Sequence, residues 1–392
     1  MGMCPGDVRA HPHFSQCFQA MQNTDGFSTW LEIDLDHIRA NVRRLLDSSG
    51  TQVMAVVKAD GYGHGALAVA RAATEAGANW CGVARLDEAL QLRRAGINRR
   101  ILVLGYTPPN RIDDALANNV ALTVYDRGVA EAYTRQAGEA GQTLRVHIKV
   151  DTGMGRLGLH TDEALAFLER SGEAGALEIE GVFTHFARAD EPGVWTTERQ
   201  LATFDRFLDE LEAIGKRPAI VHAANSSGTL YFPKARYDLV RTGIAMLGID
   251  PSPEAPLPSD YRAALSWKAR LSSKKTLPPQ HGVSYGHAYI TQTEECIGVV
   301  PVGYADGFRR VPGNYVLIEG QRVPVVGNVA MDQTMVRLDF VPQAEIGSEV
   351  VIIGRQGDQV ISAQEIARQW GTISYEVVCG LADRLPRVYL NE

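Results

Sequence analysis

Eight short apolar segments, most of them followed by a stretch of helical periodicity, dominate the sequence between residues 53 and 247. The segments are rich in β-branched residues and lie at 53–58, 80–84, 101–105, 120–124, 144–150, 179–184, 219–223 and 239–247. Apolar strands that alternate with helices are typical of a parallel sheet covered by helices. Eight repeats over about 200 residues favour a (β/α)8 TIM-type barrel in an α/β protein. An open, doubly wound sheet has the same local pattern and is the alternative.

The sequence changes character near residue 250. The segment PSPEAPLPSD has four prolines in ten residues, which is typical of a linker. Beyond it, short β-type runs separated by Gly and Pro predict a mainly-β domain. One helix is expected over 362–370, with Ser362 as its N-cap and Glu365 completing a capping box. The predicted organisation is a flexible tail over 1–27, a barrel over 28–250, a linker over 251–260 and a C-terminal mainly-β domain over 261–392.

Composition narrows the class of protein. Hydrophobic residues make up 45% and charged residues 22%, which is typical of a soluble globular chain. The 39 basic and 46 acidic residues give a net charge of −7, which disfavours nucleic-acid binding. We expect no membrane span, because no run approaches about 18 apolar residues. The tail lacks the apolar run of a secretory signal, and we expect a cytoplasmic protein.

Neither a disulfide framework nor a metal site is expected. The five cysteines are scattered along the chain and include no CxxC pair. Scattered, odd-numbered cysteines agree with a reducing compartment. The pair His11 and His13 lies in the tail and is interpreted as incidental.

Polar residues follow several of the predicted strands. In a TIM-type barrel the functional residues lie where strands end and the next loops begin. These positions hold Lys58, Arg156, His185, Asn225, Ser226, Arg241 and Gly243. If the barrel is correct, two arginines, a lysine, a histidine and a Gly/Ser-rich loop converge on one rim. Taken alone, His185 is equally consistent with a buried structural histidine whose ring nitrogens are hydrogen-bonded to a neighbouring residue.

Lys58 is the centre of this set. It follows an apolar strand, so its amine is expected at the edge of a buried region, where desolvation lowers a lysine pKa and makes the amine nucleophilic. A lone lysine at a strand end more commonly extends to water. The glycines at 61, 63 and 65 favour the first interpretation, because such a density of glycine suggests close approach of a ligand.

The loops after the last two barrel strands suggest a phosphate site. Ser226 precedes Ser227 and Gly228, and Gly243 precedes Ile244. Barrel enzymes often bind phosphate at these loops through backbone N–H groups, although two ordinary turns have the same sequence. Combined with a strand-end lysine, a phosphate site indicates pyridoxal 5′-phosphate (PLP).

Nine motifs, in order along the chain, resemble those of the bacterial alanine racemases. They are AVVKADGYGHG, KVDTGMGRLG, THFARAD, HAANSSGTL, VRTGIAMLG, VSYGHAY, VGYADGFRR, GNVAMDQTMV and YEVVC, and they cover about residues 28–390. The resemblance implies a fold-type III, PLP-dependent isomerase with a barrel and a C-terminal β-domain. It also implies a homodimer that interconverts L- and D-alanine and supplies D-alanine for peptidoglycan precursors.

The resemblance implies roles for individual residues. Lys58 resembles the Schiff-base lysine and one of two catalytic bases, and Tyr285 resembles the second base, contributed by the other subunit. Arg241 resembles the partner of the pyridine nitrogen, and His185 the bridge between that arginine and the tyrosine. The remaining matches are Arg156 and the Met331 N–H for the substrate carboxylate and cofactor oxygen, Tyr62, Asn225, Ser226, Gly243, Ile244 and Tyr375 for cofactor binding, and Lys149 for a carbamylated lysine.

The sequence departs from the family pattern near the expected substrate mouth. The departures are Gly61 for alanine, Ala330 for Cys or Ser, Val378 for proline and Ala288 for threonine. They affect the expected substrate breadth more than the reaction type. Tyr375 favours alanine, because family members that prefer serine tend to lose this tyrosine.

Four alternatives remain on the sequence alone. A broad-specificity or serine racemase differs from an alanine racemase only in the residues around the entrance to the substrate site. A PLP-carrier protein of the single-barrel kind shares the strand-end lysine but lacks the β-domain and the SYG tyrosine. A fold-type III decarboxylase pairs the pyridine nitrogen with an acid, where this chain has Arg241. Asp306 and Asp332 suggest a paired-carboxylate hydrolase only weakly, because no second acid motif accompanies them.

Overall fold

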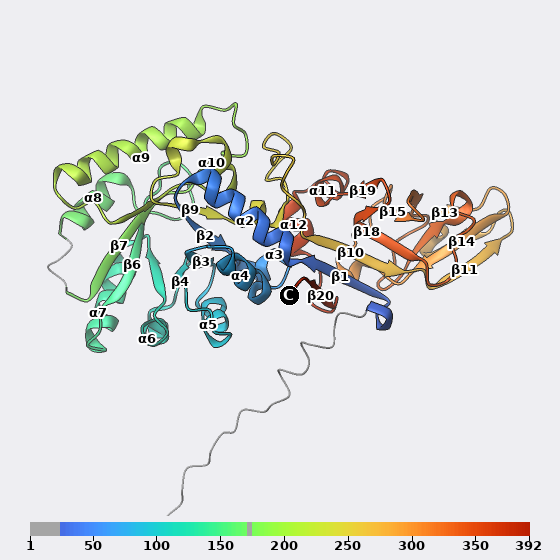
Figure 1. The fold of residues 1–392 in the computed structure, drawn as a ribbon, viewed down its shortest axis with the longest axis horizontal. Helices are drawn as coiled ribbons and strands as arrows, with labels where there is room; N and C mark the ends of the chain where they lie inside the picture. The colour runs from blue at the N-terminus through green and yellow to red at the C-terminus, as the bar shows by residue number, and fades with distance from the viewer. Residues whose placement is uncertain (1–23, 171–174) are drawn as a thin grey trace, which may run out of the picture.

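The computed structural model describes residues 24–170 and 175–392 and shows a parallel barrel beside a strand-rich domain (Figure 1). The barrel strands are β2 (Gln52–Val56), β3 (Trp80–Val83), β4 (Arg100–Val103), β5 (Ala121–Val124), β6 (Leu144–Lys149), β7 (Leu177–Phe183), β8 (Ile220–His222) and β9 (Leu239–Thr242). They form one sheet in the order β8-β7-β6-β5-β4-β3-β2-β9, and all neighbours are parallel. All eight predicted strands are present.

The two end strands of this sheet meet. Asp238 N donates to Val221 O at 3.1 Å, and Arg241 N donates to Ala224 O at 2.9 Å. These bonds bring β9 back to β8 and close the sheet almost completely. The TIM-type barrel is therefore confirmed, and the open, doubly wound sheet is excluded.

Helices cover the outside of the barrel (Figure 1). They are α2 (Leu35–Ser49), α4 (Ala66–Glu75), α5 (Leu86–Arg94), α6 (Ile112–Ala117), α7 (Arg127–Glu139), α8 (Thr161–Glu169), α9 (Thr196–Ala213) and α10 (Ser226–Tyr231). The short segment α3 (Lys58–Tyr62) follows β2 and has left-handed backbone angles. Several begin at polar N-cap residues: Asp126 accepts from Val129 N, and Asn225 accepts from Gly228 N. None of the described helices is long and apolar enough to cross a membrane.

The eighth predicted strand is shorter than expected. The apolar run 239–247 was predicted as one strand, but β9 ends at Thr242 and residues Ile244–Leu247 form a 3-10 helix, η4. The prediction was wrong here because all four residues of η4 are apolar and buried. A short apolar run has the same sequence pattern in a buried strand and in a buried helical turn. The break falls at Gly243, directly beside the cavity described below.

The second domain is mainly β, as predicted. Its larger sheet runs β16-β15-β18-β10-β1-β20, and β11-β14-β17 form a smaller one. The strands are β10 (Leu265–Arg270), β11 (Ser273–Leu277), β12 (Gly282–Val283), β13 (Tyr289–Ile290), β14 (Glu295–Val300), β15 (Tyr315–Ile318), β16 (Gln321–Pro324), β17 (Thr334–Arg337), β18 (Glu349–Gln356), β19 (Gln359–Ile361) and β20 (Arg387–Leu390). Ser362 caps α11 (Ala363–Trp370) by accepting from Glu365 N, as expected. A further helix, α12 (Ser374–Cys379), follows.

The first strand belongs to this second sheet. β1 (Thr29–Asp34) lies within the range predicted for the barrel domain, yet it pairs antiparallel with β10 and parallel with β20. Its apolar residues Trp30, Leu31 and Ile33 are buried there. A local sequence pattern cannot show which of two sheets a strand joins. The expected tail ends in a short 3-10 turn at Thr24–Gly26, and residues 1–23, including His11 and His13, lie outside the described part.

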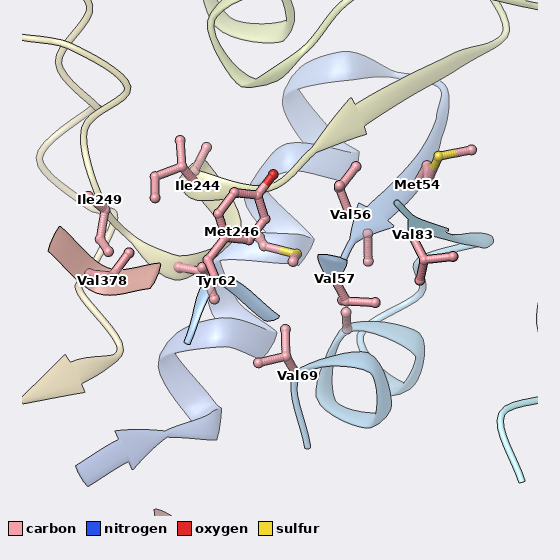
Figure 2. Packing of buried hydrophobic residues seen from close by; sticks show 14 of the residues in the cluster. Met54, Val56, Val57, Tyr62, Val69, Val83, Ile244, Met246, Ile249 and Val378 are labelled. Carbon is pink, nitrogen blue, oxygen red and sulfur yellow. The ribbon is translucent and has the colours of Figure 1, made fainter. Parts of the chain in front are cut away.

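The two domains share one apolar core. Barrel residues such as Met54 and Ile244 and second-domain residues such as Val316 and Val378 belong to the same buried cluster. Figure 2 shows Val378, from α12, among the residues of this cluster, which also includes Ile249 and Tyr62. In the predicted linker over 251–260, Ala255 is buried. The second domain therefore forms part of the surroundings of the lysine loop.

Candidate active site

The loop that carries Lys58 has an unusual backbone. Ala59, Asp60, Gly61 and Tyr62 have φ values of 51°, 52°, 62° and 55°, so four successive residues turn in the left-handed sense. Only glycine visits this region at little cost, so three of the four are strained. Such strain persists only where the surroundings fix it, and it directs attention to this loop as a functional element.

Two sets of contacts fix the loop. Glu88, on α5, accepts from Ala59 N at 2.7 Å with one oxygen and from Ala84 N at 2.7 Å with the other. From the second domain, Arg387 Nε donates to Gly63 O at 3.0 Å. A Cβ at Gly63 would lie 2.2 Å from Val378 O, so glycine is required for this close approach. The lysine loop is thus held between the barrel and the C-terminal domain.

A cavity of about 320 Å³ opens at the ends of the barrel strands. Its size is in the range of small-ligand sites. The lining residues are Val56, Lys58, Tyr62, Ala84, Leu104, Gly105, Lys149, Arg156, Leu157, Phe183, His185, Asn225, Ser226, Arg241, Gly243, Ile244 and Tyr375. Eleven of the thirteen predicted site residues are therefore brought together. Val56, Leu104, Leu157 and Phe183 were missed, because apolar wall residues look like any other strand residues in the sequence.

The two lysines of the cavity have altered acidity. Burial lowers the pKa of the Lys58 amine, and the nearby Arg156 guanidinium lowers it further. Burial, with Arg241 and Arg156, lowers the pKa of Lys149 to about 7. Lys149 Nζ also lies 4.9 Å from the centre of the Phe183 ring. Lys149 is therefore partly neutral near pH 7, and the environment of Lys58 shifts that amine toward its neutral, nucleophilic form.

Arg241 is held from several sides. Its Nη2 donates to the carbonyl oxygens of Thr184 and Ala223, each at 2.8 Å, and lies 3.1 Å from His185 Nδ1. Its Nη1 lies 2.9 Å from His222 Nδ1. Burial lowers the pKa of Arg241 to about 9, which leaves the guanidinium protonated at neutral pH. Burial and the adjacent Arg241 cation lower the pKa of His185 well below its usual value, so His185 is neutral.

Backbone N–H groups and hydroxyls form a cradle at the other end of the cavity. Ser226 Oγ accepts from Gly243 N at 3.2 Å and from Ala245 N at 3.3 Å. A Cβ at Gly243 would lie 2.4 Å from the hydroxyl of Tyr62, so only glycine lets the backbone approach. The rings of Tyr62 and Tyr375 lie 6.1 Å apart, and burial raises the pKa of both phenols. Both therefore remain neutral hydrogen-bond donors.

Tyr285 and Met331 do not line this cavity in the described part of the chain. They lie in the second domain with 72% and 54% of their surface exposed. Tyr285 is in a strained loop after Ser284, whose φ is 64° and whose hydroxyl donates to Asn328 O at 2.6 Å. Asn328 Nδ2 donates to Tyr285 O at 2.8 Å. Hydrogen bonds therefore join the Tyr285 loop to Asn328, three residues before Met331, and both predicted residues are exposed on their own chain.

The carboxylates considered for a hydrolase have another explanation. Arg384 Nε donates to Asp306 at 2.7 Å, and its Nη2 donates to Asp332 at the same distance. One guanidinium thus bridges both carboxylates and ties their loops together, which agrees with a structural role. No group of His, Cys, Asp or Glu suited to a metal ion occurs among the described residues.

Family models match nearly all of the described chain. Residues 33–251 match the alanine racemase N-terminal domain, and residues 264–389 match the alanine racemase C-terminal domain. The chain is 48% identical over 367 residues to the alanine racemase of Symbiobacterium thermophilum, covering 93% of this chain and 97% of the relative. It is 45% identical to that of Geobacillus stearothermophilus, with coverage of 93% and 94%.

Solved structures agree with these matches. The alanine racemase of D-cycloserine-producing Streptomyces lavendulae superposes with a TM-score of 0.89 at 41% identity, covering 93% of this chain and 97% of that one. The alanine racemase of Bacillus anthracis with bound L-Ala-P superposes with a TM-score of 0.88 at 43% identity, with coverage of 93% and 95%. The likeness therefore extends over both domains.

Proposed function

The chain belongs to the alanine racemase family, and on that premise we propose how its residues carry out the reaction. The reaction is the PLP-dependent interconversion of L-alanine and D-alanine. Racemisation removes the Cα proton from one face and returns one to the other. The supporting observation is the cavity itself, which places an amine of lowered pKa, a buried guanidinium and a phosphate-type cradle around about 320 Å³.

The cavity fits PLP. When bound, PLP supplies the electron sink that makes the Cα proton of an amino acid acidic. We assign the phosphate to the cradle of Ser226, Gly243, Ile244, Tyr62 and Tyr375, with Asn225 capping the helix that begins there. Backbone N–H groups at a helix start favour such an anion. Lys58 would be the residue that holds the cofactor through its aldehyde, and Arg241 would be the donor to its ring nitrogen.

Lys58 acts as one of the two bases. The lowered pKa of its amine favours the neutral form that a base requires, and the residue lines the cavity. Arg156 contacts the substrate carboxylate and a cofactor oxygen, together with the N–H of Met331, which must come from a partner subunit because Met331 lies outside the cavity of its own chain. Lys149, whose pKa is about 7, is the group that we expect to be carbamylated and to brace Arg156.

Tyr285 acts as the second base, from a partner subunit. Tyr285, the tyrosine of the SYG motif, does not line the cavity of its own chain. Its side chain is 72% exposed there. A two-fold dimer lets each chain complete the other's site. An unperturbed tyrosine has a pKa near about 10, so the cationic Arg241 must favour the phenolate through the neutral His185.

Substrate choice follows from Tyr375. Its ring lies at the cavity beside Tyr62 and narrows the space available to a substrate side chain. This supports alanine over serine, and a broad-specificity racemase is the second candidate. A Tyr375→Ala variant should raise the activity with L-serine relative to L-alanine. The product, D-alanine, is expected to supply peptidoglycan precursors in the cytoplasm.

The direct test uses purified protein. We expect a yellow protein, with visible absorbance from the lysine-bound cofactor, that brings L-alanine to zero ellipticity in circular dichroism. Lys58→Ala should lose both properties, whereas Lys275→Ala, at an exposed position of β11, should keep both. A colourless wild-type protein that does not reconstitute with PLP contradicts the proposal.

A further inference from the structure

A single file of hydrogen-bonded side chains runs from Arg241 through the inside of the barrel. Arg241 Nη1 lies 2.9 Å from His222 Nδ1, and His222 Nε2 lies 2.8 Å from His147 Nδ1. His147 Nε2 then lies 3.3 Å from Glu180 Oε2. Glu180 Oε1 pairs with Arg100 Nη1 at 3.0 Å, at the start of β4. The file therefore connects the active-site cavity with the opposite end of the barrel.

The chemistry of the first member fixes the direction of every bond in the file. A guanidinium has only donors, so His222 Nδ1 must accept from Arg241. A neutral His222 then carries its proton on Nε2 and donates it to His147 Nδ1. By the same reasoning, His147 carries its proton on Nε2 and donates to the Glu180 carboxylate. A cation and an anion are thus joined by two neutral imidazoles whose dipoles point the same way.

Strand β7 has a bulge at the point where this file of side chains crosses the barrel. Val146 pairs with Ile179, but the next residue, His147, pairs with Gly181, so Glu180 is an extra residue in β7. Such bulges, rare between parallel strands, redirect a side chain. A Cβ at Gly181 would lie 2.5 Å from His147 Nδ1, so the glycine makes room for the imidazole.

The surroundings keep both histidines neutral and fixed. Each is fully buried. Trp80 contacts His147 edge-on with ring centres 5.3 Å apart, and Phe183 stacks on His222 at 4.6 Å. Burial lowers the pKa of both imidazoles, more strongly for His222. Neither ring can rotate freely or hold a second charge beside Arg241.

We propose that His222, His147 and Glu180 are positioning residues that act on the reaction through Arg241. The inference rests on the proposed racemase function. The file holds Nη1 of Arg241 inward, and its terminal carboxylate offsets the buried guanidinium charge. Arg241 therefore donates to the ring nitrogen as a weak acid and does not protonate it. Loss of the carboxylate makes Arg241 a stronger acid, which draws electron density further into the cofactor and opens side reactions.

The first test removes the charge and keeps the acceptor. Glu180→Gln preserves an oxygen for His147, and Glu178→Gln changes an exposed glutamate of the same strand. With L-alanine, we expect Glu180→Gln to raise about tenfold the pyruvate formed per racemisation, a change of about 1.4 kcal/mol in relative barriers. In this side reaction alanine is oxidised to pyruvate, water supplies the keto oxygen, and PLP takes up the amino group and is reduced to pyridoxamine phosphate. The KM for alanine and the bound cofactor should stay unchanged. Glu178→Gln should match wild type; equal pyruvate ratios in all three proteins would overturn the proposal.

The second test asks whether the effect travels along the file. His222→Asn keeps an amide oxygen in place of Nδ1 for Arg241 but removes the donor to His147. If the file carries the effect, Glu180→Gln should add nothing to the pyruvate ratio in the His222→Asn protein. A merely structural role of Glu180 gives the same fold-change in both backgrounds, and that result would refute the inference.

A third measurement is independent of activity. Neutron diffraction of the holoenzyme locates deuterium on histidine nitrogens directly. Deuterium is expected on Nε2 and absent from Nδ1 in both His147 and His222. Deuterium on either Nδ1 would overturn the inference. Failure of the proposed function appears instead as absence of racemase activity in the unmodified protein, so the two failures are distinguishable.

Discussion

At the scale of single residues, the site depends on what burial does to charged groups. Lys58, Lys149 and Arg241 are all basic, and burial lowers the pKa of each. No carboxylate lines the cavity among the described residues, so the three cationic groups repel one another there. The result is that Lys149 is partly neutral near pH 7 and Lys58 is shifted toward its neutral form, whereas Arg241 stays charged. This difference between lysine and arginine allows one to act as a base and the other as a fixed donor.

Arg241 should control which reaction follows proton removal. We expect Arg241→Glu to form pyruvate from alanine, because a carboxylic acid can protonate the ring nitrogen where a guanidinium only donates a hydrogen bond. Racemisation should fall by about 100-fold or more. Pyruvate is measured with a coupled dehydrogenase, and visible absorbance confirms that PLP is bound. A PLP-loaded variant without pyruvate would contradict this role.

Lys149 should impose a pH dependence on stability. Its folded-state pKa of about 7 lies below the ordinary value of 10.5, so the unfolded chain binds the extra proton between these values. Burial of Lys149 therefore lowers the free energy of unfolding of the wild-type protein, and this loss becomes smaller as the pH rises. Lys149→Met should be more stable than wild type at pH about 7.5, with the difference shrinking by at most about 1.4 kcal/mol per pH unit above it.

Thermal unfolding of the two proteins at several pH values, in buffer free of carbon dioxide, measures this difference. Cofactor-free protein is used, because bound PLP would add its own stabilisation. A constant difference between wild type and Lys149→Met over this range would mean that Lys149 does not titrate there. Restoring bicarbonate should abolish the pH dependence if a carbamate forms.

At the scale of elements, the conformation of the lysine loop depends on the contacts that α5 and the second domain make with it as much as on its own sequence. Gly63 and Gly96 have similar φ values of 79° and 83°, but only at Gly63 would a Cβ meet another part of the protein, Val378 O at 2.2 Å. Gly96→Ala should cost about 1 kcal/mol through backbone strain alone. Gly63→Ala should cost more and should reduce the visible absorbance per chain, because α12 must move away from the loop.

Urea denaturation and absorbance of the two alanine variants separate strain from clash. Equal destabilisation, with full absorbance in both, would show that the contact between Gly63 and α12 has no influence on the lysine loop. The two substitutions add the same atom at similar backbone angles, so the difference between them isolates the clash.

Local pattern predicted the elements better than it predicted their partners. The barrel strands are short, apolar and followed by helices, and each could be identified from its own residues. β1 has the same appearance, yet its partners are β10 and β20, which lie hundreds of residues away. The file from His222 to Glu180 was missed for the same reason. His147 and Lys149 stand two apart in β6 and so face the same side, but no spacing in the sequence links His147 to His222.

At the scale of the whole molecule, the proposed mechanism requires a residue from a second chain. We expect Lys58→Ala and Tyr285→Phe each to lose most activity as homodimers. After unfolding and refolding together in equal amounts, they should regain about a quarter of wild-type activity, since half of the random dimers are mixed and each mixed dimer holds one intact site. Activity of the refolded mixture, compared with each parent refolded alone, checks the expectation. No recovery in a mixture shown to contain mixed dimers would place Tyr285 outside the partner's site.

The pairing of β1 with β20 also orders events during synthesis. The ribosome releases the barrel strands and Lys58 long before Arg387, Tyr389 and the rest of β20 emerge. Until then the lysine loop lacks the contact of Arg387 Nε with Gly63 O. We therefore expect nascent chains to gain the vitamin-derived cofactor only after translation of the last strand, so that a truncated polypeptide does not capture it.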